Sequence, residues 1–345
     1  MPRVRKLAFV LLFLIAFTAR AQDVRVLRAA RLWDGTGAAP VANAVVVVSG
    51  NKITAVGANV PVPANATVTD LGEVTLLPGF IDAHVHLSGE SSDNWYADFY
   101  QGVMRDPAEQ AHYAAMYARR TLEAGFTTVR DVGGENYINV GLRNAINAGI
   151  VPGPRVLTAV HAIGGTGGHA DANPIPPSTG VPQHGPIDGT CNGAAECRAA
   201  VRYQIKYGAD VIKFMPSGGV LSLADPVDAP ELSQDEMNAI VDEAHAWGRK
   251  VAAHCHGDRA GRMAIQAGVD SIEHGAFLTP ETLAHMRDKG VDLVPTLLAG
   301  ETVGTKADKF PPAIAAKARA AHDAMFSMFR NAVKAGVKIA LGTDS

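Results

Sequence analysis

Two kinds of stretch alternate along most of this chain. Helix-like stretches end in glycine, and a short run of β-branched and apolar residues that predicts a strand follows each of them within a few residues. Glycine is the expected residue after the last helical turn, because it adopts the left-handed conformation without a steric cost. The glycines at these junctions are Gly125, Gly149, Gly208, Gly248, Gly268, Gly290 and Gly336.

Seven such junctions and one earlier strand, which carries His84 and His86, predict eight strands that alternate with helices. Alternation of this kind is typical of a parallel sheet, and eight strands favour a closed (β/α)8 TIM barrel. An open, doubly wound α/β sheet is the alternative. Polar residues stand at the ends of strands from all parts of the series, which favours the barrel because closure brings these ends together.

The residues before the barrel predict a small β domain. The apolar run Val45–Val48 is followed by a turn at Ser49–Lys52 and by a second apolar run, Ile53–Val56. We therefore expect a signal peptide over residues 1–21, a small β domain over 22–75 and a barrel over 76–345.

The first residues predict a cleaved secretory signal. Three basic residues precede the apolar run Leu7–Phe17. This run is shorter than the roughly 20 residues of a membrane helix, and Ala19-Arg20-Ala21 offers the small residues of a cleavage site. We expect a secreted or periplasmic protein that begins near Gln22 and keeps no stable membrane anchor after cleavage.

The net charge of the chain argues against nucleic acid as a partner. Removal of the signal takes away four basic and no acidic residues, so the formal net charge changes from −3 to about −7. A mildly acidic chain without basic clusters gives no reason to expect nucleic-acid binding. The sequence leaves self-association open, and a homo-oligomer is compatible with it.

The three cysteines fit an oxidising compartment. Cys191 and Cys197 lie six residues apart and can close a small disulfide. Cys255 stands between two histidines of a predicted strand and faces away from them, so we expect a buried apolar thiol.

Candidate chemistry lies at the ends of the predicted strands. His84 and His86 are two residues apart, so both imidazoles point to the same side of their strand. In a barrel the ends of all the strands form one face, where such enzymes keep their sites. The residues at these ends are His84, His86, Asp131, His161, Lys213, His254, His256, His274 and Asp344.

Imidazole and carboxylate are ligands that zinc and similar divalent ions accept. His84, His86 and Asp344 form one candidate ligand group. The second group contains His274 with His254 or His256, which have the same phase on their strand.

Lys213 is the unexpected residue in this set. Its ammonium would repel two cations, and the sequence indicates no other carboxylate to bridge them. If CO2 carbamylated the neutral amine, Lys213 would present two anionic oxygens. The alternative is a salt-bridged lysine that lines the barrel.

These motifs together resemble the metal-dependent amidohydrolase superfamily, most closely its secreted Xaa-Pro dipeptidase and imidazolonepropionase-like branch. The resemblance covers residues 24–345 and rests on Pro78–His86, Lys213, Ala253–Gly257, Ile272–Gly275 and Gly342–Ser345. It implies two divalent ions, expected to be zinc, bridged by N6-carboxylated Lys213 and a hydroxide. It also implies that the N-terminal strands form a β-sandwich with strands beyond the barrel, so we expect this chain to lack part of the sandwich and the last helix.

The resemblance also implies roles for single residues. His254 rather than His256 would be the ligand, and Asp344 would take a proton from the shared water and pass it to the leaving amine. His161 would polarise the carbonyl or bind a substrate carboxylate. For Asp131 two interpretations stay open: it orients a ligand, or it has no role in the site.

The expected function is therefore a binuclear amidohydrolase that cleaves a small amide, such as an Xaa-Pro dipeptide or an N-acyl amino acid. One alternative is a mononuclear cyclic-amide hydrolase of the imidazolonepropionase type, against which Lys213 and the secretion signal argue. The other is a truncated metal-binding barrel without turnover.

Overall fold

The computed structural model describes residues 23–92, 94–171, 175–180 and 183–345. The described chain divides into two compact units, with the boundary between Pro78 and Gly79. The expected signal peptide, residues 1–21, lies outside the described residues. Among those residues, no helix has the length and apolar character that crossing a membrane requires.

The first unit is a five-stranded sheet with the order β3-β2-β1-β4, in which β5 also pairs with β1. The predicted turn is confirmed, because Ser49 pairs with Lys52 where the second and third strands meet. The β-sandwich stays a prediction, because the described strands of this unit form a single sheet. The strands are β1 (Val24–Leu32), β2 (Val41–Ser49), β3 (Lys52–Gly57), β4 (Thr67–Asp70) and β5 (Thr75–Leu76).

The second unit holds parallel strands in two runs, β6-β7-β8 and β9-β10-β11-β12. An isolated bridge between Ile163 and Phe214 joins the runs on one side. On the other side Leu293 bridges to Ile339, and Ala83 N–H donates to the Leu341 carbonyl at 2.8 Å. The strands are β6 (Phe80–Val85), β7 (Phe126–Asp131), β8 (Arg155–Thr158), β9 (Val211–Phe214), β10 (Lys250–Cys255), β11 (Ser271–His274) and β12 (Asp292–Val294).

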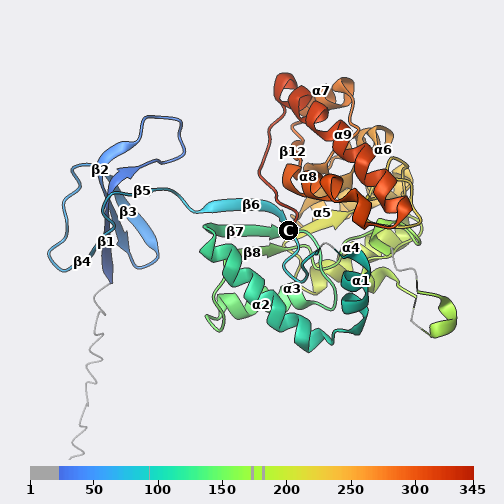
Figure 1. Ribbon diagram of the computed structural model, residues 1–345, viewed down its shortest axis with the longest axis horizontal. Coiled ribbons are helices and arrows are strands. Elements are labelled where there is room, and N and C mark those ends of the chain that lie inside the picture. The colour runs from blue at the N-terminus through green and yellow to red at the C-terminus, as the bar shows by residue number, and fades with distance from the viewer. Residues whose placement is uncertain (1–22, 93, 172–174, 181–182) are drawn as a thin grey trace, which may run out of the picture. The chain divides into compact units, whose positions relative to one another are not determined.

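These links close the barrel, but the eighth strand is shorter than predicted. Ile339 forms a single bridge rather than a strand, and the segment that follows reaches the end of β6, where His86 N–H donates to the Ser345 carbonyl at 3.0 Å. Figure 1 shows the last residue beside the ends of β6 and β7. The terminal segment thus takes the place of the eighth strand.

Helices lie around these strands (Figure 1). All seven glycines that the sequence placed at helix ends have positive φ values, so the predicted C-caps are confirmed. The α-helices are α1 (Trp95–Met104), α2 (Pro107–Glu123), α3 (Ile138–Asn147), α4 (Ala194–Lys206), α5 (Gln234–Ala246), α6 (Asp258–Ala267), α7 (Pro280–Lys289), α8 (Leu297–Thr305) and α9 (Pro312–Ala335). Short 3-10 helices occur at η1 (His169–Asp171), η2 (Pro177–Thr179), η3 (Pro186–Asp188) and η4 (Ala307–Lys309).

Strand alternation directs Lys213 into the barrel. Ile212 and Phe214, its neighbours on β9, are fully buried in the apolar cluster between strands and helices. Lys213 therefore points to the opposite side, where Val211 packs with Ala159 and Ala252.

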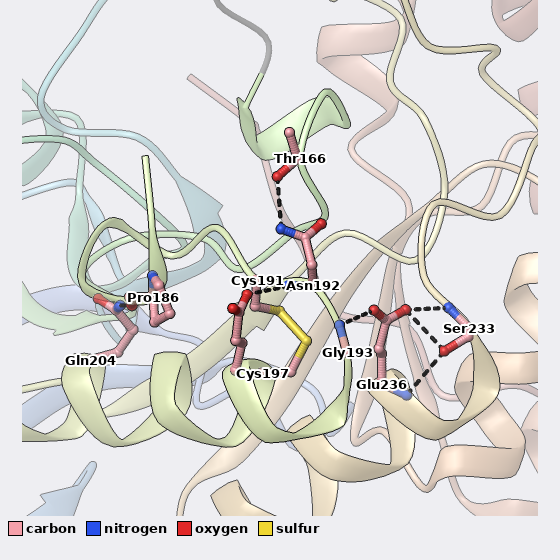
Figure 2. Close-up of a disulfide and its surroundings, with 10 residues drawn as sticks. Thr166, Pro186, Cys191, Asn192, Gly193, Cys197, Gln204, Ser233 and Glu236 are labelled. Atoms are coloured by element: carbon pink, nitrogen blue, oxygen red, sulfur yellow. Dashed lines mark hydrogen bonds between the residues drawn. A yellow bond between two sulfur atoms is a disulfide. The ribbon is translucent and has the colours of Figure 1, made fainter. Parts of the chain in front are cut away.

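A hydrogen bond links the N-terminal ends of α4 and α5 (Figure 2). Ser233 and Glu236 form the capping box of α5, and Glu236 Oε1 accepts from the Gly193 N–H at 2.6 Å. The structure also confirms the disulfide between Cys191 and Cys197, which joins a residue shortly before α4 to a residue within α4.

Replacing both of these cysteines with alanine should lower the free energy of unfolding by about 2 kcal/mol, because a six-residue loop then regains its freedom in the unfolded chain. Urea unfolding of the oxidised wild type and of Cys191→Ala/Cys197→Ala measures the difference. The wild type under a reducing agent should approach the variant. Equal stability of all three would contradict an anchoring role.

Candidate metal centre

A cavity of about 900 Å³ opens at the ends of the barrel strands. Every residue predicted to bind metal contributes to its wall, although these residues come from five places in the chain. They are His84, His86, Lys213, His254, His256, His274 and Asp344.

The first ligand group forms where β6 meets the terminal segment. Asp344 N–H donates to the His84 carbonyl at 2.8 Å, which brings the carboxylate to the histidine pair. Asp344 Oδ1 lies 3.3 Å from His84 Nε2 and 3.4 Å from His86 Nε2. These three side chains are close enough together to hold one ion.

The second group consists of His254, His256 and His274, whose ligand atoms lie within 4.8 Å of one another. The structure therefore brings both His254 and His256 to the site, and their positions do not decide which of the two would bind an ion. The two groups adjoin, because His274 Nδ1 lies 3.8 Å from Asp344 Oδ2 and the His84 and His274 rings are 4.9 Å apart.

Hydrogen bonds fix the orientation of three of these imidazoles. His86 Nδ1 lies 2.8 Å from the Gly133 carbonyl, and His274 Nδ1 lies 2.7 Å from Thr296 Oγ1. His84 Nδ1 lies 2.8 Å from Glu273 Oε2. The buried His84 Nε2 has no hydrogen-bond partner among the described residues, and a metal ion would satisfy it.

The backbone is strained at three points around the site. His274, Thr296 and Asp344 have φ values of 68°, 45° and 60°, in the left-handed region that residues other than glycine rarely occupy. Such strain persists where the surroundings impose it, and it concentrates at functional sites. Here two of the strained residues, His274 and Asp344, are candidate metal ligands, and Thr296 is the hydrogen-bond partner of His274.

Burial keeps the imidazoles of the second group neutral. It lowers the pKa of His256 to about 3, and it lowers the pKa values of His254 and His274 well below their usual range. Burial alone would raise the pKa of Asp344, but the neighbouring imidazoles of His84, His86 and His274 outweigh it and hold the pKa well below its usual value. The second group thus offers neutral imidazoles and Asp344 offers a carboxylate, the protonation states that metal ligands need.

Lys213 is 1% exposed. Burial lowers its pKa to about 8, although the charges of Glu273 and Asp344 act in the opposite direction. A lysine with this pKa has a substantial neutral fraction at mildly alkaline pH, and the neutral amine is the form that reacts with CO2.

Glu273 and Arg130 are the residues that the sequence interpretation missed. Glu273 is fully buried, and Arg130 Nη2 donates to its Oε1 at 2.7 Å. All four residues of β11 are buried, so a glutamate there needs a cationic partner. The signal was a charged residue inside a predicted strand of the barrel. The Glu273 carboxylate is not available to bridge two metal ions, because Arg130 and His84 contact its two oxygens.

Asp131 lies behind His86, at the end of β7. Its carboxylate accepts from Leu87 N–H at 3.1 Å, from Asn139 Nδ2 at 3.2 Å and from Gly133 N–H at 3.3 Å. The Gly133 carbonyl is the group next to His86 Nδ1. This placement supports the predicted orienting role.

His161 is not among the described residues that line the cavity. Its ring lies 4.8 Å from the Tyr137 ring, and its Nδ1 lies 3.3 Å from the Ile187 carbonyl. This position does not support the predicted contact with substrate. His169, the first residue of η1, does line the cavity, and its ring lies 4.4 Å from the ring of His254.

The rest of the cavity wall is largely apolar. Helix α1 contributes Trp95 and Phe99, and the segments around α8 and α9 contribute Leu298, Phe310 and Met325. A polar centre at one end of an apolar cavity is typical of sites for small molecules.

Comparisons with known proteins agree with this geometry. A family model described as "Amidohydrolase family" matches residues 75–345. Ochratoxinase from Aspergillus niger is 34% identical over 352 residues, which cover 96% of this chain and 71% of that protein.

Solved structures are similar over nearly the whole chain. An Xaa-Pro dipeptidase with methionine bound in its active site has a TM-score of 0.87 and 36% identity, covering 94% of this chain and 80% of that one. A prolidase complexed with N-methylphosphonate-L-proline has a TM-score of 0.83 and 31% identity, covering 93% and 78%. The crystal structure of A. niger ochratoxinase has a TM-score of 0.81 and 34% identity, covering 94% and 76%.

Proposed function

Because this chain belongs to the amidohydrolase family and is a hydrolase of amide or peptide bonds, we propose that it is a binuclear metal-dependent enzyme. Its substrate would be a dipeptide such as Xaa-Pro or an N-acyl amino acid. The observation that carries the proposal is the presence of two adjoining groups of three donor side chains at one end of the barrel.

The donor set fits divalent ions such as zinc, because it combines imidazoles with a carboxylate. The free Nε2 of His84 supports this fit. One ion would be held by His84, His86 and Asp344, and the second by His254 and His274, with His256 as the alternative donor to His254.

Lys213 would complete the centre as an N6-carboxylated lysine. It lines the cavity shared by both groups, and it is buried. Its carbamate would supply the bridging anion, because Glu273 is engaged by Arg130 and His84.

Ions at such a site lower the pKa of water toward neutrality and polarise carbonyl groups. Asp344 would transfer the proton: its low pKa keeps it ionised, so it can accept a proton from the attacking water and deliver it to the leaving amine nitrogen. The hydrogen bonds that fix His86 and His274 would keep these imidazoles oriented during the reaction.

The apolar wall supports a substrate with an apolar side chain. Burying one such side chain against Trp95, Phe99 and Met325 would contribute roughly 1.5–3 kcal/mol to binding. The names of the similar proteins, an Xaa-Pro dipeptidase and an ochratoxinase, guide the choice of test substrates.

With zinc supplied, the purified protein should contain about two ions per chain and hydrolyse at least one member of a panel of Xaa-Pro, Xaa-Arg and N-acyl amino acid substrates. Elemental analysis and amine release measure the two properties, and chelation followed by zinc addition is the control. One ion per chain with cleavage of a cyclic amide would favour the mononuclear alternative. Two ions without any turnover would favour a metal-binding barrel.

We also propose a secreted or periplasmic location without a stable membrane anchor. The disulfide between Cys191 and Cys197 supports it, because disulfides persist in oxidising compartments. The expected signal peptide points the same way.

A further inference from the structure

We infer that Glu273, held by Arg130, is a positioning residue that fixes the proton of His84 on Nδ1 and directs the Nε2 lone pair at the metal centre. The inference rests on the proposed function, in which His84 is a metal ligand. It adds Glu273 on β11 and Arg130 on β7, neither of which is among the described residues that line the cavity.

The Glu273 carboxylate is fully buried and has a partner at each oxygen. Oε1 accepts from Arg130 Nη2 at 2.7 Å and from Ser271 Oγ at 2.6 Å. Oε2 lies 2.8 Å from His84 Nδ1. One oxygen is therefore directed at Arg130 and the other at the histidine.

Arg130 is itself fixed between two strands. Its Nε donates to the Ala83 carbonyl on β6 at 2.6 Å, and its Nη1 donates to Ser271 Oγ on β11 at 3.0 Å. Buried ion pairs seldom add stability over an apolar replacement, because both charges lose their hydration. The ion pair of Arg130 and Glu273 is therefore better explained by its contact with His84, whose imidazole it orients.

The chemistry of the partners determines the histidine tautomer. An ionised carboxylate only accepts hydrogen bonds, so Glu273 holds a proton on His84 Nδ1. The neutral imidazole then keeps its lone pair on Nε2, the nitrogen that would bind the ion. That Nε2 has no hydrogen-bond partner among the described residues and lies 3.3 Å from Asp344 Oδ1.

His84 differs from the other oriented imidazoles of the centre in the charge of its partner. His86 bonds to a backbone carbonyl and His274 to the Thr296 hydroxyl, and both partners are neutral. A carboxylate partner raises the basicity of the ligating nitrogen. The group that contains His84 should therefore bind the first ion more tightly than the group that contains His274.

Glu273→Gln tests the inference, because it keeps the shape but removes the charge. The glutamine amide has one oxygen and one NH₂ group, so the NH₂ group must face either the N–H donor of Arg130 or Nδ1 of His84. When it faces His84, Nδ1 has to accept and the proton moves to Nε2, so the variant should contain a mixture of His84 tautomers. ¹⁵N-histidine NMR of the metal-free protein, assigned with a His84→Asn variant, measures this. Zinc titration with a competing chelator should show the tighter site weakened by about 10- to 100-fold.

Glu243→Gln is the matched control. Glu243 is also a buried carboxylate, and it accepts from Arg202 Nε at 2.7 Å and from Trp247 Nε1 at 2.9 Å, but on α5. This variant should lose comparable thermal stability and leave both the His84 tautomer and the zinc affinity unchanged.

A wild-type protein with the His84 proton on Nε2 would overturn the inference, and this measurement needs no variant to fold. Wild-type zinc affinity in Glu273→Gln would overturn it as well. A wild type that binds zinc with the expected tautomer but hydrolyses no substrate would instead overturn the proposed function and leave the positioning role supported.

Discussion

Lys213→Ala should lower the bound metal from about two ions per chain toward one or none and abolish amide hydrolysis. An ammonium about 4 Å from a cation is repelled by roughly 4 kcal/mol per pair of unit charges, even at an effective dielectric constant of about 20. A carbamate on the same nitrogen would reverse the sign of this interaction and bridge the ions. Elemental analysis and the substrate panel measure the two losses.

Chemical rescue separates the bridging role from a structural one. Short carboxylic acids such as acetate can enter the space that alanine leaves at position 213 and restore part of the activity. Lys213→Arg is the control, because it keeps the positive charge and leaves no space. A Lys213→Ala protein with two ions and full activity would refute the binuclear mechanism.

Asp344→Asn should reduce the turnover number by about 10²- to 10⁴-fold, the usual contribution of a general acid–base group. The carboxylate lies against His84 and His86 and is ionised, whereas a carboxamide cannot take a proton. Steady-state kinetics at saturating substrate, with the metal content measured on the same sample, tests the expectation.

The choice of asparagine follows from the backbone. Asp344 has a φ value of 60°, which asparagine tolerates better than alanine does, so the variant should keep the terminal segment in place. Ser345→Ala, one residue further on, is the control and should retain activity. Wild-type turnover in Asp344→Asn would assign proton transfer to another group.

The barrel was predictable because its signals are local. Seven helix ends are marked by a glycine a few residues before the next strand, and the structure confirms the left-handed conformation at all seven positions. In the structure, strand alternation then places Lys213 inside the barrel, opposite the apolar neighbours Ile212 and Phe214. The eighth strand was overpredicted, because a β-branched run does not show how much of it will find a partner; Ile339 forms only one bridge.

The amino-acid sequence by itself determined the order of the barrel elements and the set of residues at their ends, because both follow from periodicity within about ten residues. Only the tertiary structure decided which of these residues meet. His84 and Glu273 are 189 residues apart in sequence, and Arg130 and Glu273 are 143 apart, so no local pattern indicates that they are partners. His169 lines the cavity, whereas His161 is not among the described residues that do. The cause is the same, because the path of a loop depends on long-range packing, which hydrophobic periodicity does not reveal.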